Sequence, residues 1–112
     1  MARTMRDAAE LFERAAAADQ AGDLGQAEEL YEAVLAAQPL HADALYRLAV
    51  VKSRRGRTGE ALPLMNRLVA LRPTSAEAHL ARGTVLHNTG RLPQAVSSYD
   101  KALALKPDSL AA

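Results

Sequence analysis

Apolar residues recur at spacings of three and four along most of the chain, which is the pattern that one face of a helix produces. In the first such segment they are Met5, Ala8, Leu11, Phe12, Ala15 and Ala18. Similar segments follow, and glycine or proline separates them. The pattern predicts six helices, at about residues 4–21, 24–37, 42–55, 58–71, 76–89 and 92–105.

Landmarks of three kinds repeat at an interval of 34 residues. They are Gly22, Gly56 and Gly90; Ala27, Ala61 and Ala95; and Pro39, Pro73 and Pro107. Each glycine can take the left-handed conformation that ends a helix, and each proline stops the helix before it. A period of this length is typical of a solenoid, in which each unit buries its apolar face against its neighbours.

Pro63 interrupts this regularity because it lies more than one turn into the fourth predicted helix. A proline there removes a helical hydrogen bond, and its ring crowds the preceding turn. We therefore predict a late or kinked start for this helix. Pro93 differs, because it lies in the first turn of the sixth helix, where proline is tolerated.

Small and large residues also alternate with the period, and the combined pattern resembles the tetratricopeptide repeat family from about residue 8 to residue 109. Small residues recur at two equivalent positions and large residues at a third: Ala15, Ala49 and Gly83; Ala27, Ala61 and Ala95; Tyr31, Met65 and Tyr99. Small residues let the two helices of a repeat approach closely, and the large residue fills the space beside them.

This resemblance implies an all-α fold, a right-handed α-solenoid of three helix-turn-helix repeats with six helices and no clear C-terminal capping helix. The repeats would span about residues 8–41, 42–75 and 76–109 of a single domain covering residues 1–112.

The resemblance also implies a function, because tetratricopeptide arrays are binding modules whose first helices line a concave groove. The candidate peptide-binding residues in this register are Phe12, Tyr46, Arg47, Val50, Arg54, Leu80, Thr84, His87 and Asn88. We expect a non-catalytic scaffold that binds a peptide or protein segment there. The alternative for the apolar row of Phe12, Tyr46 and Leu80 is helix–helix packing.

Chaperone-binding members of the family hold a peptide's terminal carboxylate with a clamp of lysine, asparagine, asparagine, lysine and arginine. The corresponding residues here are Phe12, Ala16, Arg47, Glu77 and Ala81, and none matches its clamp residue. We therefore do not expect a clamp for an acidic C-terminal peptide, which Glu77 would repel.

The last predicted helix should carry an exposed apolar face, because Leu110–Ala112 fall where a seventh helix would begin. We expect Val96, Leu103 and Leu105 to be exposed there, with Tyr99 partly covered. This face would serve for self-association into a homo-oligomer. The alternative is that the chain belongs to a longer protein whose next helix covers it.

Composition and charge narrow the choice of partners. The net charge of +1 gives no overall attraction to nucleic acid or to an anionic membrane, and the N-terminus does not have the pattern of a signal peptide. The basic run at residues 52–57 has no interleaved aromatic residue, so we interpret it as solvated cations at a helix C-terminus. We therefore expect a cytoplasmic protein with no nucleic-acid or membrane partner.

No catalytic arrangement stands out. The sequence has no cysteine, and His41, His79 and His87 lack metal-site spacing, so we expect no metal and no cofactor. Nothing in the pattern places a nucleophile beside a base, so we do not expect an enzyme. Two alternatives remain: the substrate-positioning arm of a larger bacterial enzyme, such as a glycosyltransferase or sulfotransferase, and a small secretion-type chaperone.

Overall fold

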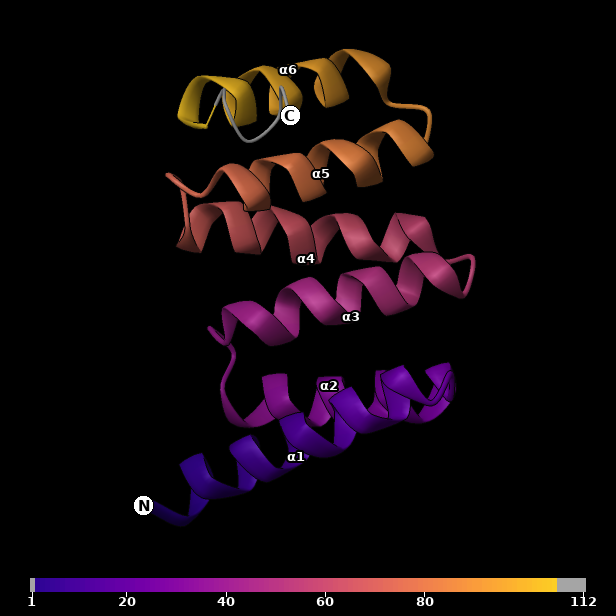
Figure 1. The fold of residues 1–112 in the computed structure, drawn as a ribbon, viewed down its shortest axis with the longest axis vertical. Coiled ribbons are helices and arrows are strands. Elements are labelled where there is room, and N and C mark those ends of the chain that lie inside the picture. The colour runs from indigo at the N-terminus through magenta and orange to yellow at the C-terminus, as the bar shows by residue number, and fades with distance from the viewer. Residues whose placement is uncertain (1, 107–112) are drawn as a thin grey trace.

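The protein is described here by a computed structural model that covers residues 2–106 of the chain. Over this range it consists of six α-helices: α1 Ala2–Gln20, α2 Leu24–Ala37, α3 Ala42–Arg54, α4 Thr58–Leu71, α5 Ala76–Asn88 and α6 Leu92–Leu105. They stack in chain order, so that α1 and α6 lie at opposite ends of the molecule (Figure 1). The fold is the all-α solenoid predicted from the sequence, and none of the described helices is long and apolar enough to cross a membrane.

We predicted a late or kinked start for α4, and the late start is wrong. The helix begins at Thr58 and continues through Pro63 to Leu71. Pro63 and Gly59 are both exposed. The proline ring therefore lies on the solvent side of the helix, where water can hydrate the Gly59 carbonyl that Pro63 cannot bond.

The three glycine turns share one geometry. Gly22, Gly56 and Gly90 have φ of 82°, 81° and 79°. In each turn the residue after the glycine donates its N–H to a carbonyl five residues earlier, as from Arg57 to Lys52 at 2.8 Å and from Arg91 to Leu86 at 2.8 Å. This bond closes a Schellman motif, in which an L side chain at the glycine position would be strained.

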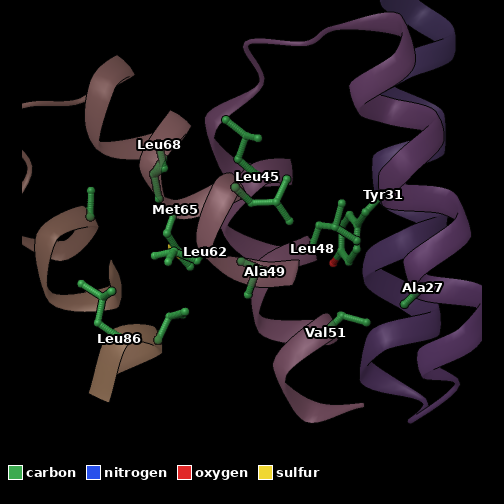
Figure 2. Close-up of a cluster of buried hydrophobic side chains, with 14 of the residues drawn as sticks. Ala27, Tyr31, Leu45, Leu48, Ala49, Val51, Leu62, Met65, Leu68 and Leu86 are labelled. Carbon is green, nitrogen blue, oxygen red and sulfur yellow. The ribbon is translucent and has the colours of Figure 1, made fainter. Parts of the chain in front are cut away.

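The hydrophobic core runs continuously along the stack. Figure 2 shows Tyr31 of α2 beside Leu48 of α3, and Met65 of α4 further along. The small residues predicted at helix crossings are buried: Ala15, Ala27, Ala49, Ala61, Gly83 and Ala95. Each repeat therefore packs its own helix pair and also contributes to a core shared with its neighbours.

Candidate functional site

A cavity of about 380 Å³ lies between α3 and α5. One wall is the face of α3 that carries Tyr46, Val50, Ser53 and Arg54, at the spacing of successive helical turns. The facing residues of α5 include Leu80, Ala81, Thr84 and Asn88. Buried Met65 and Val85 complete the lining. The site therefore has an apolar interior with polar groups at its edge.

A second cavity, of about 310 Å³, lies toward the N-terminal ends of the same two helices. Its lining includes Asp43, Arg72 and Ser75, and it shares Tyr46 and Glu77 with the first cavity. Tyr46 is 45% exposed. We call the two cavities together the α3–α5 groove. Because Tyr46 borders both cavities, its side chain can contact a ligand seated in either one.

Six of the nine predicted peptide-binding residues line the larger cavity: Tyr46, Val50, Arg54, Leu80, Thr84 and Asn88. The other three, Phe12, Arg47 and His87, line neither cavity of the groove. Sequence reasoning did not find Met65 or Val85 as lining residues, because their register marks them as core.

Phe12 is a packing residue. Its ring stacks on His41 at 5.0 Å between centroids and lies 5.7 Å from the Tyr31 ring. The Arg47 guanidinium carbon lies 5.6 Å from the centroid of the Phe12 ring, in reach of a cation–π interaction. The structure thus favours the packing alternative for Phe12 and separates it from Tyr46 and Leu80.

Two charged residues at the groove, Arg54 and Glu77, have partners within the chain. Arg54 donates to Asp19 at 3.2 Å, and the Tyr31 hydroxyl donates to the other Asp19 oxygen at 3.3 Å. Burial and the Asp19 charge both raise the pKa of Tyr31, so its hydroxyl stays protonated. At the shared border of the two cavities, Lys106 donates to Glu77 at 2.7 Å, and that bond lowers the pKa of Glu77.

One polar atom in the larger cavity is different. The hydroxyl oxygen of Ser53 is buried and has no hydrogen-bond partner among the described residues. Buried hydroxyls normally find a partner, because leaving one unpaired costs about 1–3 kcal/mol. Ser53 therefore carries the unpaired polar group among the residues of this wall.

The basic run at residues 52–57 is not the set of solvated cations that we expected. Lys52 is 8% exposed, and its ammonium donates to Glu28 at 3.2 Å and to Glu60 at 3.0 Å. Arg55 and Arg57 each donate to Glu28 at 2.8 Å. The run therefore joins the second repeat to the first through Glu28, which is itself 6% exposed.

Electrostatics explain how Glu28 stays charged at this depth. Burial alone would raise its pKa, but hydrogen bonds from Arg55 and Lys52 and the charges of Lys52 and Arg57 outweigh burial, so the pKa is lowered. Burial alone would lower the pKa of Lys52, and bonds to Glu60 and Glu28 outweigh that effect and raise it. The sequence contained a signal for this buried carboxylate, because Glu28 interrupts the apolar stripe of α2 between Leu24 and Tyr31.

Two of the three histidines have structural roles. His41 caps α3, because its Nδ1 accepts the N–H of Ala44 at 3.1 Å. His79 Nε2 lies 2.8 Å from the Pro73 carbonyl. Within residues 2–106 no group of three or more metal-ligating side chains comes together.

The predicted self-association residues lie at the end of the stack, on α6. Val96 and Leu103 are exposed and Tyr99 is partly buried, as expected. Leu105 is partly buried rather than exposed, and exposed Leu92 was not predicted. The position expected for a seventh helix, Leu110–Ala112, lies outside the described residues.

The sequence matches the model of a family described as Tetratricopeptide repeat, over residues 12–76 and 51–109. A search of curated proteins finds no match. Among solved structures, the first TPR of Spaghetti (RPAP3) bound to an HSP90 peptide has a TM-score of 0.86 and 23% identity, covering 92% of this chain and 82% of that one.

Two other solved structures are similar over almost all of this chain but are longer. MamA from Desulfovibrio magneticus RS-1 has a TM-score of 0.83 and 27% identity, covering 89% of this chain and 56% of that one. A mutant O-GlcNAc transferase of Thermobaculum terrenum has a TM-score of 0.83 and 32% identity, covering 95% of this chain. This chain spans only 20% of that transferase.

Proposed function

On the premise that the chain belongs to the tetratricopeptide repeat family, as the match over residues 12–109 shows, we propose that it is a non-catalytic scaffold that binds a peptide or protein segment. The segment lies along the α3–α5 groove. The observation that carries the proposal is the cavity of about 380 Å³ bordered by Tyr46, which is 45% exposed. Ligand pockets in proteins start at about 300 Å³ and are mostly apolar inside.

The lining favours a segment with one large aliphatic or aromatic side chain. Val50, Met65 and Leu80 would surround that side chain, and Tyr46 would cover it from the edge. Arg54 and Asn88 stand at the rim, where they can bond the backbone or polar side chains of the segment. The mechanism is burial on a preformed surface, which needs no chemistry from the scaffold.

The HSP90 peptide in the RPAP3 structure supports a peptide as the ligand class, but this chain would recognise a different kind of peptide. At the positions of the chaperone clamp it has Phe12 in a packed cluster and Glu77 tied to Lys106. Recognition through an apolar anchor, rather than through a terminal carboxylate, fits these residues.

Selection from a displayed random-peptide library on the 112-residue chain tests the proposal. The enriched peptides should share an aliphatic or aromatic residue. Tyr46→Ala should weaken binding of a labelled consensus peptide by more than about fivefold, the loss expected for a central anchor. Leu40→Ala is the matched control, because Leu40 is 70% exposed and lies outside the groove. Failure to enrich any peptide, or equal binding by both variants, would overturn the proposal.

A second candidate is that the groove belongs to the substrate-positioning arm of a larger enzyme. The 32% identity with the O-GlcNAc transferase over 95% of this chain favours it. The sequence of the gene on both sides of the 112 codons decides the matter. A transferase domain in the same reading frame supports this candidate, and an open reading frame limited to repeats rejects it.

We also propose that the apolar end of the stack binds a second copy of the chain. Leu92, Val96, Tyr99 and Leu103 form this surface, which we call the α6 face. Covering exposed apolar area is favourable by about 25 cal/mol per Å² before association entropy is counted. Leu103→Glu should lower the weight-average mass in sedimentation, and Leu40→Glu should not. A chain that stays monomeric at every concentration would refute self-association.

A further inference from the structure

We infer that the α6 face binds the outward surface of α1 of another copy, so that the copies join head to tail. This inference rests on the self-association proposed above and adds the identity of the second surface. The two surfaces lie at opposite ends of the stack (Figure 1). The argument comes from the junctions between repeats within the chain, which show how such surfaces pack.

At each internal junction, the first helix of one repeat covers the second helix of the repeat before it. The α4 residues that lie 34 positions before Val96 and Tyr99 are Leu62 and Met65, which are 9% and 1% exposed. Val96 at the uncovered end is 56% exposed. The α6 face is therefore the same surface that α3 covers on α2 and α5 covers on α4, without a first helix packed on it among the described residues.

Two polar contacts fix the register of these junctions. Lys52 of α3 bonds Glu28 of α2 at 3.2 Å, and Arg82 of α5 bonds Asn66 of α4 at 2.6 Å. Shifting the residue numbers of each contact by multiples of 34 gives the pair of residues that would make the equivalent contact between two copies.

The equivalents are complementary. The Lys52–Glu28 contact becomes Ala18 of one copy on Val96 of the other, which is an apolar pair. The Arg82–Asn66 contact becomes Arg14 on Asp100, which is an ion pair. A charged acceptor makes this hydrogen bond stronger than the one that Asn66 makes inside the chain.

The outward surface of α1 has the exposure that this geometry requires. Arg14 and Ala17 are exposed, whereas their equivalents in α3, Leu48 and Val51, are buried. A twofold contact between two α6 faces is less favourable, because centring it between Val96 and Leu103 would bring the two Asp100 carboxylates together.

One residue limits the strength of the head-to-tail contact. Glu10 is exposed on α1, and its equivalents Ala44 and Ala78 are both buried at the internal junctions. A second copy would have to desolvate the Glu10 carboxylate where the internal junctions place a methyl group. Association should therefore be weak in the natural sequence and stronger in Glu10→Ala.

The first experiment measures association of the full chain by sedimentation velocity over a range of concentrations up to about 1 mM. Arg14→Glu and Asp100→Arg should each weaken association at least threefold. The double variant Arg14→Glu/Asp100→Arg should recover it, because the charges are exchanged. Glu10→Ala should strengthen association, and Arg72→Glu, which makes the same charge change between α4 and α5, should leave it unchanged. Circular dichroism checks that each variant folds.

The second experiment tests whether association is head to tail, by mixing two variants that are each blocked at one end. Arg14→Glu keeps an intact α6 face, and Val96→Glu keeps an intact α1 surface. Head-to-tail binding predicts that each variant alone associates more weakly than wild type, and that the mixture forms a 1:1 dimer that does not grow further. If Val96→Glu abolishes association and Arg14→Glu leaves it unchanged, self-association stands and the head-to-tail inference is overturned. A wild type that stays monomeric at every concentration would overturn both.

Discussion

The ring of Tyr99 lies so close to Gly83 that a Cβ atom on Gly83 would come within 2.7 Å of the ring carbons Cδ1 and Cε1. The equivalent pair in the second repeat is Ala49 and Met65, both buried. The two repeats thus fill the same crossing in different ways. A glycine faces a rigid ring in one, and the other has a buried alanine and a flexible thioether at the equivalent positions.

Gly83→Ala should therefore destabilise the protein, although alanine is the better helix former. Helix propensity favours alanine by about 1 kcal/mol, and overpacking against the ring costs about 1–3 kcal/mol. We expect a net loss of about 1 kcal/mol in the free energy of unfolding, measured by urea denaturation. Gly83→Ala/Tyr99→Met, which copies the second repeat, should recover the loss. A gain in stability for Gly83→Ala alone would show that the ring moves aside freely.

The junction between the first two repeats allows a similar exchange. Glu28 and Lys52 correspond to Leu62 and Leu86 at the next junction, where both leucines are buried. Glu28→Leu alone should cost about 3 kcal/mol of unfolding free energy, because it removes the buried carboxylate that Lys52, Arg55 and Arg57 share and leaves the buried Lys52 ammonium with only the exposed Glu60 and Glu32. Glu28→Leu/Lys52→Leu should recover most of this loss. Equal destabilisation by the single and double variants would show that Arg55 and Arg57, rather than Lys52, depend on Glu28.

The same network predicts how stability changes with pH. The pKa of Glu28 is lowered from 4.5, because the cations outweigh the effect of its burial. Its contribution to stability is therefore complete above pH 4.5 and is lost as the pH falls through the lowered value in the folded state. The pKa of Lys52 is raised from 10.5, since its bonds to Glu60 and Glu28 outweigh burial. Its contribution is complete below pH 10.5 and is lost as the pH rises through the raised value.

Urea midpoints from about pH 7 to about pH 3 test this prediction against Glu28→Leu/Lys52→Leu. Wild type should lose more stability than the double variant below pH 4.5, and the difference between them should stay constant near neutral pH. Parallel curves across the acid range would contradict a Glu28 pKa that is lowered by folding.

The sequence was sufficient for the fold because its signals are local and repeated. The glycines at intervals of 34 residues need positive φ, and all three have it. Helix bounds followed from the apolar period and the prolines. Pro63 misled the prediction, because the cost of a proline within a helix depends on whether the freed carbonyl meets water, and that depends on the tertiary position of the helix face.

The candidate site was predicted only in part, for a physical reason. Register places Tyr46 and Leu80 on a shared concave face, but the Phe12 ring is turned into a cluster with His41 and Tyr31 by contacts between repeats. The run from Lys52 to Arg57 was misinterpreted because its partner, Glu28, lies 24 residues before Lys52 and on another helix. The repeat period and helix propensity do not predict such pairings, because a pairing depends on whether one side chain can reach another across the junction between repeats.

Pro63 allows a direct test of local helix energetics. Pro63→Ala restores an N–H donor to the Gly59 carbonyl in α4 and removes the crowding by the ring. We expect the free energy of unfolding to rise by about 1–3 kcal/mol, less the entropy that proline removes from the unfolded chain. Pro93→Ala is the matched control, because Pro93 lies in the first turn of α6 and takes no helical bond away. Pro93→Ala should be neutral or slightly destabilising; equal gains for both variants would refute the explanation.

Replacing Ser53 with alanine should affect the stability of the protein and its binding of a peptide in opposite senses. The Ser53 hydroxyl oxygen is buried and has no partner among the described residues, and Ser53 is one of the residues that line the larger cavity of the α3–α5 groove. Ser53→Ala should raise the free energy of unfolding by about 1 kcal/mol, because it removes an unpaired polar group and adds helix propensity. Exposed Ser97 in α6 is the control, and Ser97→Ala should gain only the smaller stabilisation that comes from the higher helix propensity of alanine.

Binding of the library-selected peptide should change in the opposite sense. If the Ser53 hydroxyl bonds the ligand, Ser53→Ala should weaken affinity by about fivefold or more, which corresponds to the net value of one hydrogen bond. Fluorescence anisotropy with the labelled peptide measures this change, and Ser97→Ala should leave it unaltered. A less stable Ser53→Ala variant would show that the hydroxyl is already satisfied in the free protein. A stable variant with unchanged affinity would remove Ser53 from recognition, and binding would then rest on the apolar walls alone.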